Sequence, residues 1–231
     1  MGYATKDLHN HLIYYDADEP QRWLDVIGPN VVKHVLNGDE LHRDVYTITA
    51  VGTSTVLQAD STTGGQVVFT SDTTENDGVQ IQLLGEAFYL SGVHYPCYFG
   101  ARFKVNDADQ VDAFVGLAVQ DTTILVGCQD DIGFRTVDES ATLTFLLEKG
   151  GSETTVSIDT LVDDTYVVVE LYYDGSTVTY YLDGVETGSV ATSETNFPDD
   201  EHLSPALALL AGENAANTMT VDWARWFQIQ E

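Results

Sequence analysis

The sequence predicts an all-β protein, an antiparallel sandwich of two sheets preceded by a short N-terminal arm. From Val45 onward, runs rich in Val, Ile, Leu, Tyr and Thr recur with Gly, Asp and Asn between them. No helical period longer than about two turns interrupts these runs. Residues 164–190 contain two such runs joined by a short turn and a third after Asp183-Gly184, which is typical of a β-meander. Many short strands without crossover helices favour two packed antiparallel sheets.

The first element in chain order is the segment of residues 1–44. It holds four of the six histidines and four of the nine basic residues, and it is too short to own a core. We therefore expect an N-terminal arm, followed by one sandwich domain over residues 45–231. Glu19–Ile27 favours one or two helical turns, whereas residues 31–36 fit a short helix or a strand equally well. Docking on its own domain or on a neighbouring subunit would use apolar side chains of the arm: Trp23, Leu24, Ile27, Val31 and Val35.

The strands expected after the arm are short and separated by turn residues such as Gly64-Gly65, Asp77-Gly78 and Gly150-Gly151. In one of them Val178, Tyr180 and Leu182 alternate with more polar neighbours, so one face can be buried. Residues 191–203 form a longer polar loop. The expected strands are Val45–Val51, Gln66–Thr70, Val79–Leu84, Tyr98–Val105, Ala113–Val119, Ile132–Val137, Ala141–Lys149, Thr154–Ile158, Tyr166–Tyr173, Thr177–Leu182 with the run after it, Pro205–Leu210 and Thr218–Gln230.

The meander also carries a resemblance to a known family. Its string Val-Glu-Leu-Tyr-Tyr-Asp-Gly, followed by Tyr-Leu-Asp-Gly, resembles the strand-turn-strand signature of concanavalin A-like jelly rolls, which include laminin-G domains, legume lectins and laminarinase-type glucanases. With residues 75–82, 99–103 and 215–223 it is most similar to LamG-like proteins of tailed-phage virions. The resemblance covers roughly residues 45–231. It implies a jelly-roll fold and a virion structural role, although one fold of this kind serves many activities.

The composition restricts the partners. Nine basic residues against 37 acidic ones give a formal net charge of −28, which argues against nucleic acid or an anionic membrane as a partner. Cys97 and Cys128 both lie in strand-like runs, where a disulfide between them is possible but not implied. No signal peptide and no apolar run of about 18 residues is found, so we expect synthesis and retention in a host cytoplasm until assembly into a virion.

Catalytic and metal-binding motifs find little support in the sequence. A laminarinase-type hydrolase needs two carboxylates on one strand, with a signature such as Glu-x-Asp-x-x-Glu, and no such run exists; the nearest acidic clusters, residues 107–112 and 138–139, are expected in turns. Nucleophile elbows and phosphate-binding loops are also absent. We therefore expect no enzymatic activity and no cofactor. Calcium is the best ionic candidate because it takes carboxylates from acidic loops, and its candidate ligands are Asp107, Asp109 and Asp112.

Sugar binding is the alternative that the aromatic residues suggest. Rings exposed on a sheet can stack on sugars, and the chain has 12 Tyr and 3 Trp. Adjacent tyrosines at 172–173 and 180–181 place one ring on each face of their strands, as do Trp223 and Trp226. The candidate glycan-binding residues are Tyr173, Tyr181 and Trp226, although these rings can equally fill the core.

These observations lead to one expected function and two alternatives. We expect a non-enzymatic phage virion structural protein: a capsid decoration or cement protein, or a head or tail-fibre component. Its partners would be the major capsid protein or other virion proteins and further copies of itself. A glycan-binding, lectin-like module that contacts a surface glycan is the alternative, and a laminarinase-type glycoside hydrolase is third.

Overall fold

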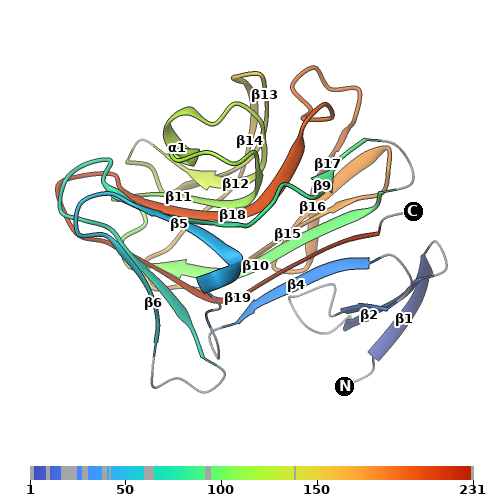
Figure 1. The fold of residues 1–231 in the computed structure, drawn as a ribbon, viewed down its shortest axis with the longest axis horizontal. Coiled ribbons are helices and arrows are strands. Elements are labelled where there is room, and N and C mark those ends of the chain that lie inside the picture. Colours follow the sequence, from blue (N-terminus) through green and yellow to red (C-terminus); the bar gives the residue numbers. More distant parts are fainter. Residues whose placement is uncertain are drawn as a thin grey trace.

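A computed structural model describes residues 3–8, 11–16, 25–27, 31–37, 41, 43–59, 65–91, 95–137 and 139–229. It confirms the predicted fold class: two antiparallel sheets pack face to face as a jelly-roll sandwich (Figure 1). None of the helices in this part of the chain has the length and apolar character needed to cross a membrane.

We call one layer the back sheet. Its strand order is β17-β16-β15-β10-β19-β7-β6, and β4 pairs with the C-terminal part of β19. The strands are β4 (Val31–Asn37), β6 (Thr55–Gln58), β7 (Val67–Thr70), β10 (Cys97–Val105), β15 (Val167–Tyr173), β16 (Thr177–Leu182), β17 (Val185–Ala191) and β19 (Thr218–Ile229).

We call the other layer the front sheet. Its strand order is β14-β13-β12-β11-β18-β8-β5, and the short β9 pairs with the start of β18. The strands are β5 (Tyr46–Ala50), β8 (Gly78–Leu83), β9 (Phe88–Tyr89), β11 (Val111–Ala118), β12 (Asp131–Thr136), β13 (Thr142–Lys149), β14 (Ser152–Thr160) and β18 (His202–Ala211). A 3-10 turn, η1 (Arg43–Val45), precedes β5, and one helical turn, α1 (Ile124–Gly127), lies between β11 and β12.

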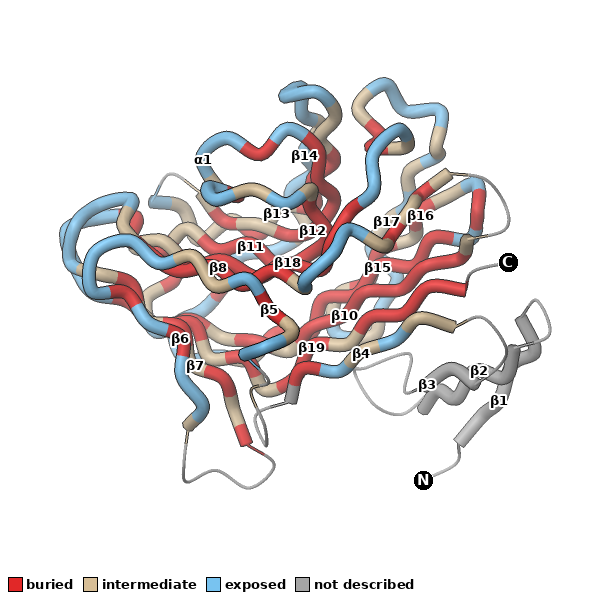
Figure 2. Tube along the Cα trace, in the orientation of Figure 1, coloured by how far each residue is buried: buried red, intermediate tan, exposed pale blue. Residues whose placement is uncertain are grey.

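The core lies between the two sheets because side chains alternate along every strand. In β12, for example, Ile132 and Phe134 are at most 1% exposed and belong to the main apolar cluster. Figure 2 shows buried residues running along β10, β15 and β19, with exposed residues in the loops. Each sheet therefore has an inner face that forms the core and an outer face that does not contribute to it.

The predicted meander is confirmed as β15-β16-β17. The Asp174 carboxylate accepts hydrogen bonds from the backbone N–H groups of Ser176 (2.8 Å) and Thr177 (2.9 Å), while Gly175 has φ 101°. These local turn signals explain why the sequence alone predicted the meander.

The N-terminal segment differs from its prediction at Asp25–Ile27, whereas residues 31–37 form a strand, which was one of the two alternatives. Asp25–Ile27 forms strand β3, which pairs with β2 (His11–Asp16), itself paired with β1 (Tyr3–Leu8), and is not the end of a helical turn. Strand β4 is part of the back sheet, with Val31 half-buried and Val35 46% exposed. Trp23 and Leu24 lie outside the described residues, and of Ile27 only the backbone in β3 is described. The docking role of the arm stays a prediction.

Candidate functional site

Three acidic side chains lie in line across neighbouring strands of the front sheet. The strand register places Asp131 opposite Glu148, and Glu148 opposite Glu153. Because Asp131 precedes the core residue Ile132, its side chain points to the outer face. We call these three residues the acidic row.

Asp131 is the most perturbed member of the acidic row. It is 2% exposed, and its Oδ1 has no hydrogen-bond partner. Burial raises the pKa of its carboxyl to about 8, with a further contribution from the nearby Glu148 charge. The group therefore holds its proton near neutral pH, which is unusual for an aspartate.

Glu148 and Glu153 are more open to solvent than Asp131. Burial also raises the pKa of the half-buried Glu148 carboxyl, and the Arg135 guanidinium opposes this shift. Arg135 points to the same face as Asp131 and forms an ion pair with Glu153. The acidic row thus combines a buried carboxyl, a half-buried one and an exposed one that is paired with a cation.

A segment of the chain covers the middle of this outer face. Residues 119–130, which we call the cover segment, include α1 and are fixed by two glutamines of β8. The Gln80 side chain donates to the Asp121 carbonyl (2.5 Å) and accepts from the Ile124 N–H (3.0 Å). The Gln82 side chain donates to the Val119 carbonyl (2.8 Å). Figure 1 shows α1 over the front sheet, with β13 and β14 rising beside it.

Small residues and one large ring lie beneath the cover segment. Phe114 is 1% exposed and packs in a second apolar cluster with Ile124, Cys128 and Leu146. A Cβ at Gly116 would lie 2.9 Å from the Phe114 ring, so this glycine makes room for the ring. The outer face is therefore packed like a core here, and the acidic row lies at its margin.

A pair of stacked rings lies at the same end of the front sheet as the acidic row. Tyr89 and His202 are opposite each other on β9 and β18, and their rings stack with centroids 4.6 Å apart. The buried side chain of Gln228 holds Tyr89 by accepting from its N–H (3.2 Å) and donating to its carbonyl (2.8 Å). His202 is exposed and Tyr89 is half-buried, so the stack presents ring surface to solvent. We call these two residues the ring stack.

The strand register places the ring stack and the acidic row on one edge of the outer face. Ser204 and Asp131 both lie opposite Ala118, one on each side of β11. His202 lies two residues before Ser204 on β18. From strand spacing and rise, the backbone positions of His202 and Asp131 are about 12 Å apart.

The expected hydrolase motif, two acids on one strand, does not occur on β12. Its outward positions carry Asp131, Gly133 and Arg135 instead. The two adjacent carboxyls, those of Asp131 and Glu148, come from different strands. Sequence reasoning missed them because the expected strand began at Ile132, after Asp131, and because the search for paired acids ran along single strands, whereas the proximity of the two carboxyls depends on register.

The predicted glycan-binding rings lie inside the protein. Tyr173 and Trp226 are 0% and 1% exposed and belong to the main core. Tyr181 points to the outer face of the back sheet but is 7% exposed, in a cluster with Tyr98, Tyr172 and Phe227. The opposite orientations of Trp223 and Trp226 are as expected. These placements leave no free ring face for a sugar at these three positions.

The predicted calcium ligands do not converge. Asp107 and Asp109 lie in the turn after β10, where burial and a hydrogen bond that the protonated Asp107 carboxyl donates to Asp109 raise the pKa of Asp107. Asp112 lies in β11. Within the described ranges, no three Asp, Glu, His or Cys side chains are grouped as metal ligands would be. Cys97 and Cys128 are both buried free thiols.

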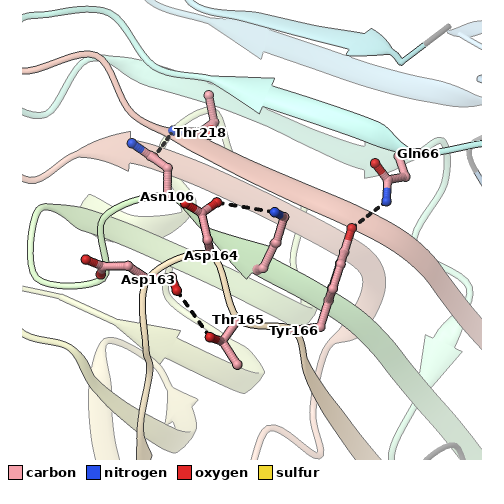
Figure 3. A network of polar contacts seen from close by, with 8 residues as sticks. Gln66, Asn106, Asp163, Asp164, Thr165, Tyr166 and Thr218 are labelled. Carbon is pink, nitrogen blue, oxygen red and sulfur yellow. Dashed lines mark hydrogen bonds and ion pairs between the residues drawn. The ribbon is translucent and has the colours of Figure 1, made fainter. Parts of the chain in front are cut away.

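The outer face of the back sheet has a different character. Arg102 lies 3.9 Å from the centre of the Tyr166 ring and forms a 2.5 Å ion pair with Asp222. Figure 3 shows Tyr166 accepting a hydrogen bond from Gln66 and Asp164 accepting one from a lysine, which is Lys104 (3.2 Å). On this face Arg102 and Lys104 each pair with an acid, and Arg102 also contacts an aromatic ring.

Comparison with known proteins finds likeness in structure alone. No family model and no curated protein matches the sequence. A protein of unknown function from Shewanella oneidensis MR-1 matches with TM-score 0.62 and 15% identity, over 86% of each chain. A glycoside hydrolase family 16 enzyme of the Bacteroides ovatus mixed-linkage glucan locus matches with TM-score 0.63 and 12% identity, over 84% of this chain and 99% of its own. A laminarinase from Flavobacterium sp. UMI-01 matches with TM-score 0.59 and 13% identity, over 84% of this chain and 99% of its own. At these identities the likeness shows the fold, a concanavalin A-like sandwich.

Two expectations are corrected by these neighbours. The expected virion structural function is contradicted, because the similar structures with a named activity are glucanases and laminarinases. The expectation that the protein is not an enzyme conflicts with the same finding. The resemblance to concanavalin A-like jelly rolls is consistent with the neighbours, whereas its narrower association with phage virions has no counterpart in the structures named here.

Proposed function

We propose that the protein binds a polysaccharide chain on the outer face of the front sheet, at the edge where the ring stack and the acidic row lie. The observation that carries this proposal is the exposed ring stack, in line with outward carboxyls on the same sheet. Sugar rings present apolar C–H faces that stack on aromatic rings, and carboxylates accept hydrogen bonds from sugar hydroxyls. A separation of about 12 Å between the two groups suits an oligosaccharide that contacts both.

The burial pattern supports the same edge. The cover segment occupies the middle of the outer face, so an extended ligand has to pass beside it. His202, Glu148 and Glu153 all retain solvent exposure there. Gln228 fixes the backbone of Tyr89, which limits the entropy that the ring would lose on binding.

Affinity electrophoresis in gels that contain laminarin or mixed-linkage glucan tests the proposal. We expect both polysaccharides, or one of them, to retard the protein, and His202→Ala and Tyr89→Ala to abolish most of the retardation. Tyr166→Ala, which removes a ring from the opposite face, is the matched control and should migrate like the unmodified protein. Equal loss in all three folded variants would place the sugar elsewhere.

We infer a second candidate function, cleavage of a glycosidic bond, from the pair Asp131 and Glu148. Glycoside hydrolysis uses one protonated and one ionised carboxyl, and in retaining enzymes they are roughly 5 to 5.5 Å apart. Asp131 and Glu148 are opposite each other on antiparallel strands, so their side chains are neighbours on one face of the sheet. With a pKa of about 8, Asp131 can donate a proton to the departing oxygen. Glu148 would attack the sugar carbon as the glycosidic bond breaks, forming a glycosyl ester, and water would then displace Glu148 while giving a proton to the ionised Asp131.

Release of reducing ends from laminarin or mixed-linkage glucan tests the second candidate. We expect Asp131→Asn and Glu148→Gln each to lower any rate by a factor of about 100 or more. Glu186→Gln, on the exposed edge strand β17, should leave the rate unchanged. Binding without any release of reducing ends would leave the first proposal standing and remove the second.

A further inference from the structure

We infer that a second copy of this chain docks on β5, the edge strand of the front sheet, so that two front sheets join into one sheet across a twofold axis. The inference does not depend on glycan binding. It follows from three features of this edge: the strand carries no charge, it borders an apolar groove, and its sequence is complementary to itself when it is paired antiparallel.

The strands β5 and β6 differ in charge from other edge strands of the two sheets. The edge strands β4, β14 and β17 carry Lys33, Glu153 with Asp159, and Glu186, respectively. Charges of this kind discourage an edge from pairing with another chain. By contrast, β5 (Tyr-Thr-Ile-Thr-Ala) and β6 (Thr-Val-Leu-Gln) carry no charge, in a chain whose formal net charge is −28. A second copy would therefore meet little electrostatic repulsion at these two strands.

An apolar groove of about 220 Å³ lies between β5 and β6, at the side of the sandwich where both sheets end. Ile48 and Ala50 of β5 line it, together with Val56 and Leu57 of β6. Leu57 is 54% exposed. Arg43 reaches across from the start of β5, where its guanidinium donates to the Val56 carbonyl (2.5 Å). A second copy at this edge would remove apolar surface from water, which favours association.

The backbone of β5 directs alternate residues toward the free edge. The Val51 N–H donates to the Gly78 carbonyl (2.9 Å), so the odd-numbered residues of this strand bond to β8. The N–H and C=O groups of Tyr46, Ile48 and Ala50 therefore point away from β8. Among the described strands, none pairs with β5 on that side. These groups can accept another antiparallel strand.

A twofold axis at Ile48 makes β5 its own partner. In that register Tyr46 lies opposite Ala50 of the second copy, and Ile48 lies opposite Ile48. The three hydrogen-bonded pairs would supply about six bonds between the chains, two for each pair. Thr47 lies opposite Thr49 on the outer face, and threonine pairs of this kind stabilise antiparallel strands.

The same register brings opposite charges together at the ends of β5. Continued beyond the strand, it places Arg43 near Thr53 of the second copy. The Thr53 N–H donates to the Asp72 carboxylate (2.5 Å), and this bond and one from the Thr73 N–H lower the pKa of Asp72 to about 2. Asp72 is therefore ionised at neutral pH, and the twofold axis creates the Arg43–Asp72 approach twice. This charge complementarity favours a second copy over an unrelated strand.

Sedimentation velocity from about 1 µM to about 1 mM protein tests the inference. We expect the mass of the unmodified protein to approach twice that of the 25.3 kDa chain. Thr47→Lys combined with Thr49→Lys puts like charges opposite each other and should weaken self-association at least about tenfold, although it reduces the net negative charge. Mixing this variant with Thr47→Glu combined with Thr49→Glu should restore a dimer, because each lysine then faces a glutamate.

The matched control makes the same charge change on another edge. Thr187→Lys combined with Ser189→Lys alters exposed positions of β17 and should dimerise like the unmodified protein. If the variants of Thr47 and Thr49 do not fold, Ala50→Pro provides a second test. It removes an N–H from the free edge while the bonds to β8 remain, and it should also weaken the dimer at least about tenfold.

Three outcomes would overturn the inference. The first is a monomer at every concentration of the unmodified protein, which would leave the groove to a partner of another sequence. The second is a dimer that persists in the lysine variant of β5 or in Ala50→Pro. The third is a mixture of the folded lysine and glutamate variants that stays monomeric. None of these results bears on retardation by laminarin or mixed-linkage glucan, so the proposed glycan binding is tested separately.

Discussion

The outer faces of the two sheets solve the same packing problem in opposite ways. On the back sheet, the charged groups of β10 are matched: Arg102 contacts both Asp222 and the Tyr166 ring, and Lys104 pairs with Asp164. On the front sheet, acids face one another in a row, and the buried Asp131 has an oxygen without a donor. The back face also buries an acid, Glu170, which is 0% exposed, but there the Tyr98 hydroxyl donates to the carboxylate (2.8 Å), whereas no donor reaches Asp131 Oδ1 on the front face. This difference locates the candidate site.

The largest difference between the two faces should appear in stability when Asp131, the buried acid of the front face, is replaced by asparagine. Asp131 has a folded-state pKa of about 8, above the ordinary value of 3.8, so the native state binds its proton more tightly than the unfolded state does. Its contribution to stability is complete below about pH 4 and declines as pH rises to about 8. Asp131→Asn should therefore match the unmodified protein at pH 4. At pH 9 the free energy of unfolding of Asp131→Asn should exceed that of the unmodified protein by up to about 5 kcal/mol.

Urea denaturation at the two pH values measures this effect. Asp164→Asn, at an exposed and paired acid near the back sheet, should change stability by less than about 1 kcal/mol at either pH. A flat difference between Asp131→Asn and the unmodified protein across the pH range would contradict the raised pKa.

The next largest effect tests whether the covered part of the front face behaves as a core. Phe114→Ala removes a ring that is 1% exposed and should cost about 3 to 4 kcal/mol in chemical denaturation. Leu57→Ala, at a residue 54% exposed on β6, should cost less than about 0.5 kcal/mol. Similar small costs for both would show that the cover segment does not bury the ring in solution.

A smaller effect should follow from loosening the cover segment. Gln80→Ala leaves the Asp121 carbonyl and the Ile124 N–H without the partner that they have now. We expect a loss of about 1 to 3 kcal/mol. Hydrogen exchange should speed up for residues 119–130 while the amides of β10 and β19 stay protected. Uniform acceleration across both sheets would mean that Gln80 supports the whole sandwich and not this segment.

The smallest effect is expected on the matched face. Arg102→Ala removes a half-exposed cation from the Tyr166 ring and from Asp222, and it should cost about 1 kcal/mol or less. The cost should shrink as salt is added, because the pair is partly exposed. A loss of several kcal/mol in thermal or urea unfolding would show that the back face depends on this contact far more than its exposure suggests.

The sequence was sufficient for local features and insufficient for the site. Strand Thr177–Leu182 was predicted with the bounds that the structure has, because side-chain alternation and an Asp-Gly turn are local signals. The proximity of Asp131 to Glu148 depends on how β12 and β13 align, and residues 17 positions apart carry no mark of it. The ring stack was missed for the same reason, since His202 and Tyr89 meet only through the pairing of β18 with β9.

The two free cysteines give the molecule a pair of built-in reporters. Cys97 lies in the core between the sheets, and Cys128 belongs to the cover segment and is buried against the outer face of the front sheet. A thiol must reach solvent before it can be alkylated. Labelling of Cys128 would therefore report local opening of the cover segment, whereas labelling of Cys97 would report separation of the two sheets. The ratio of the two labelling rates would thus compare local breathing with global opening, without any added probe.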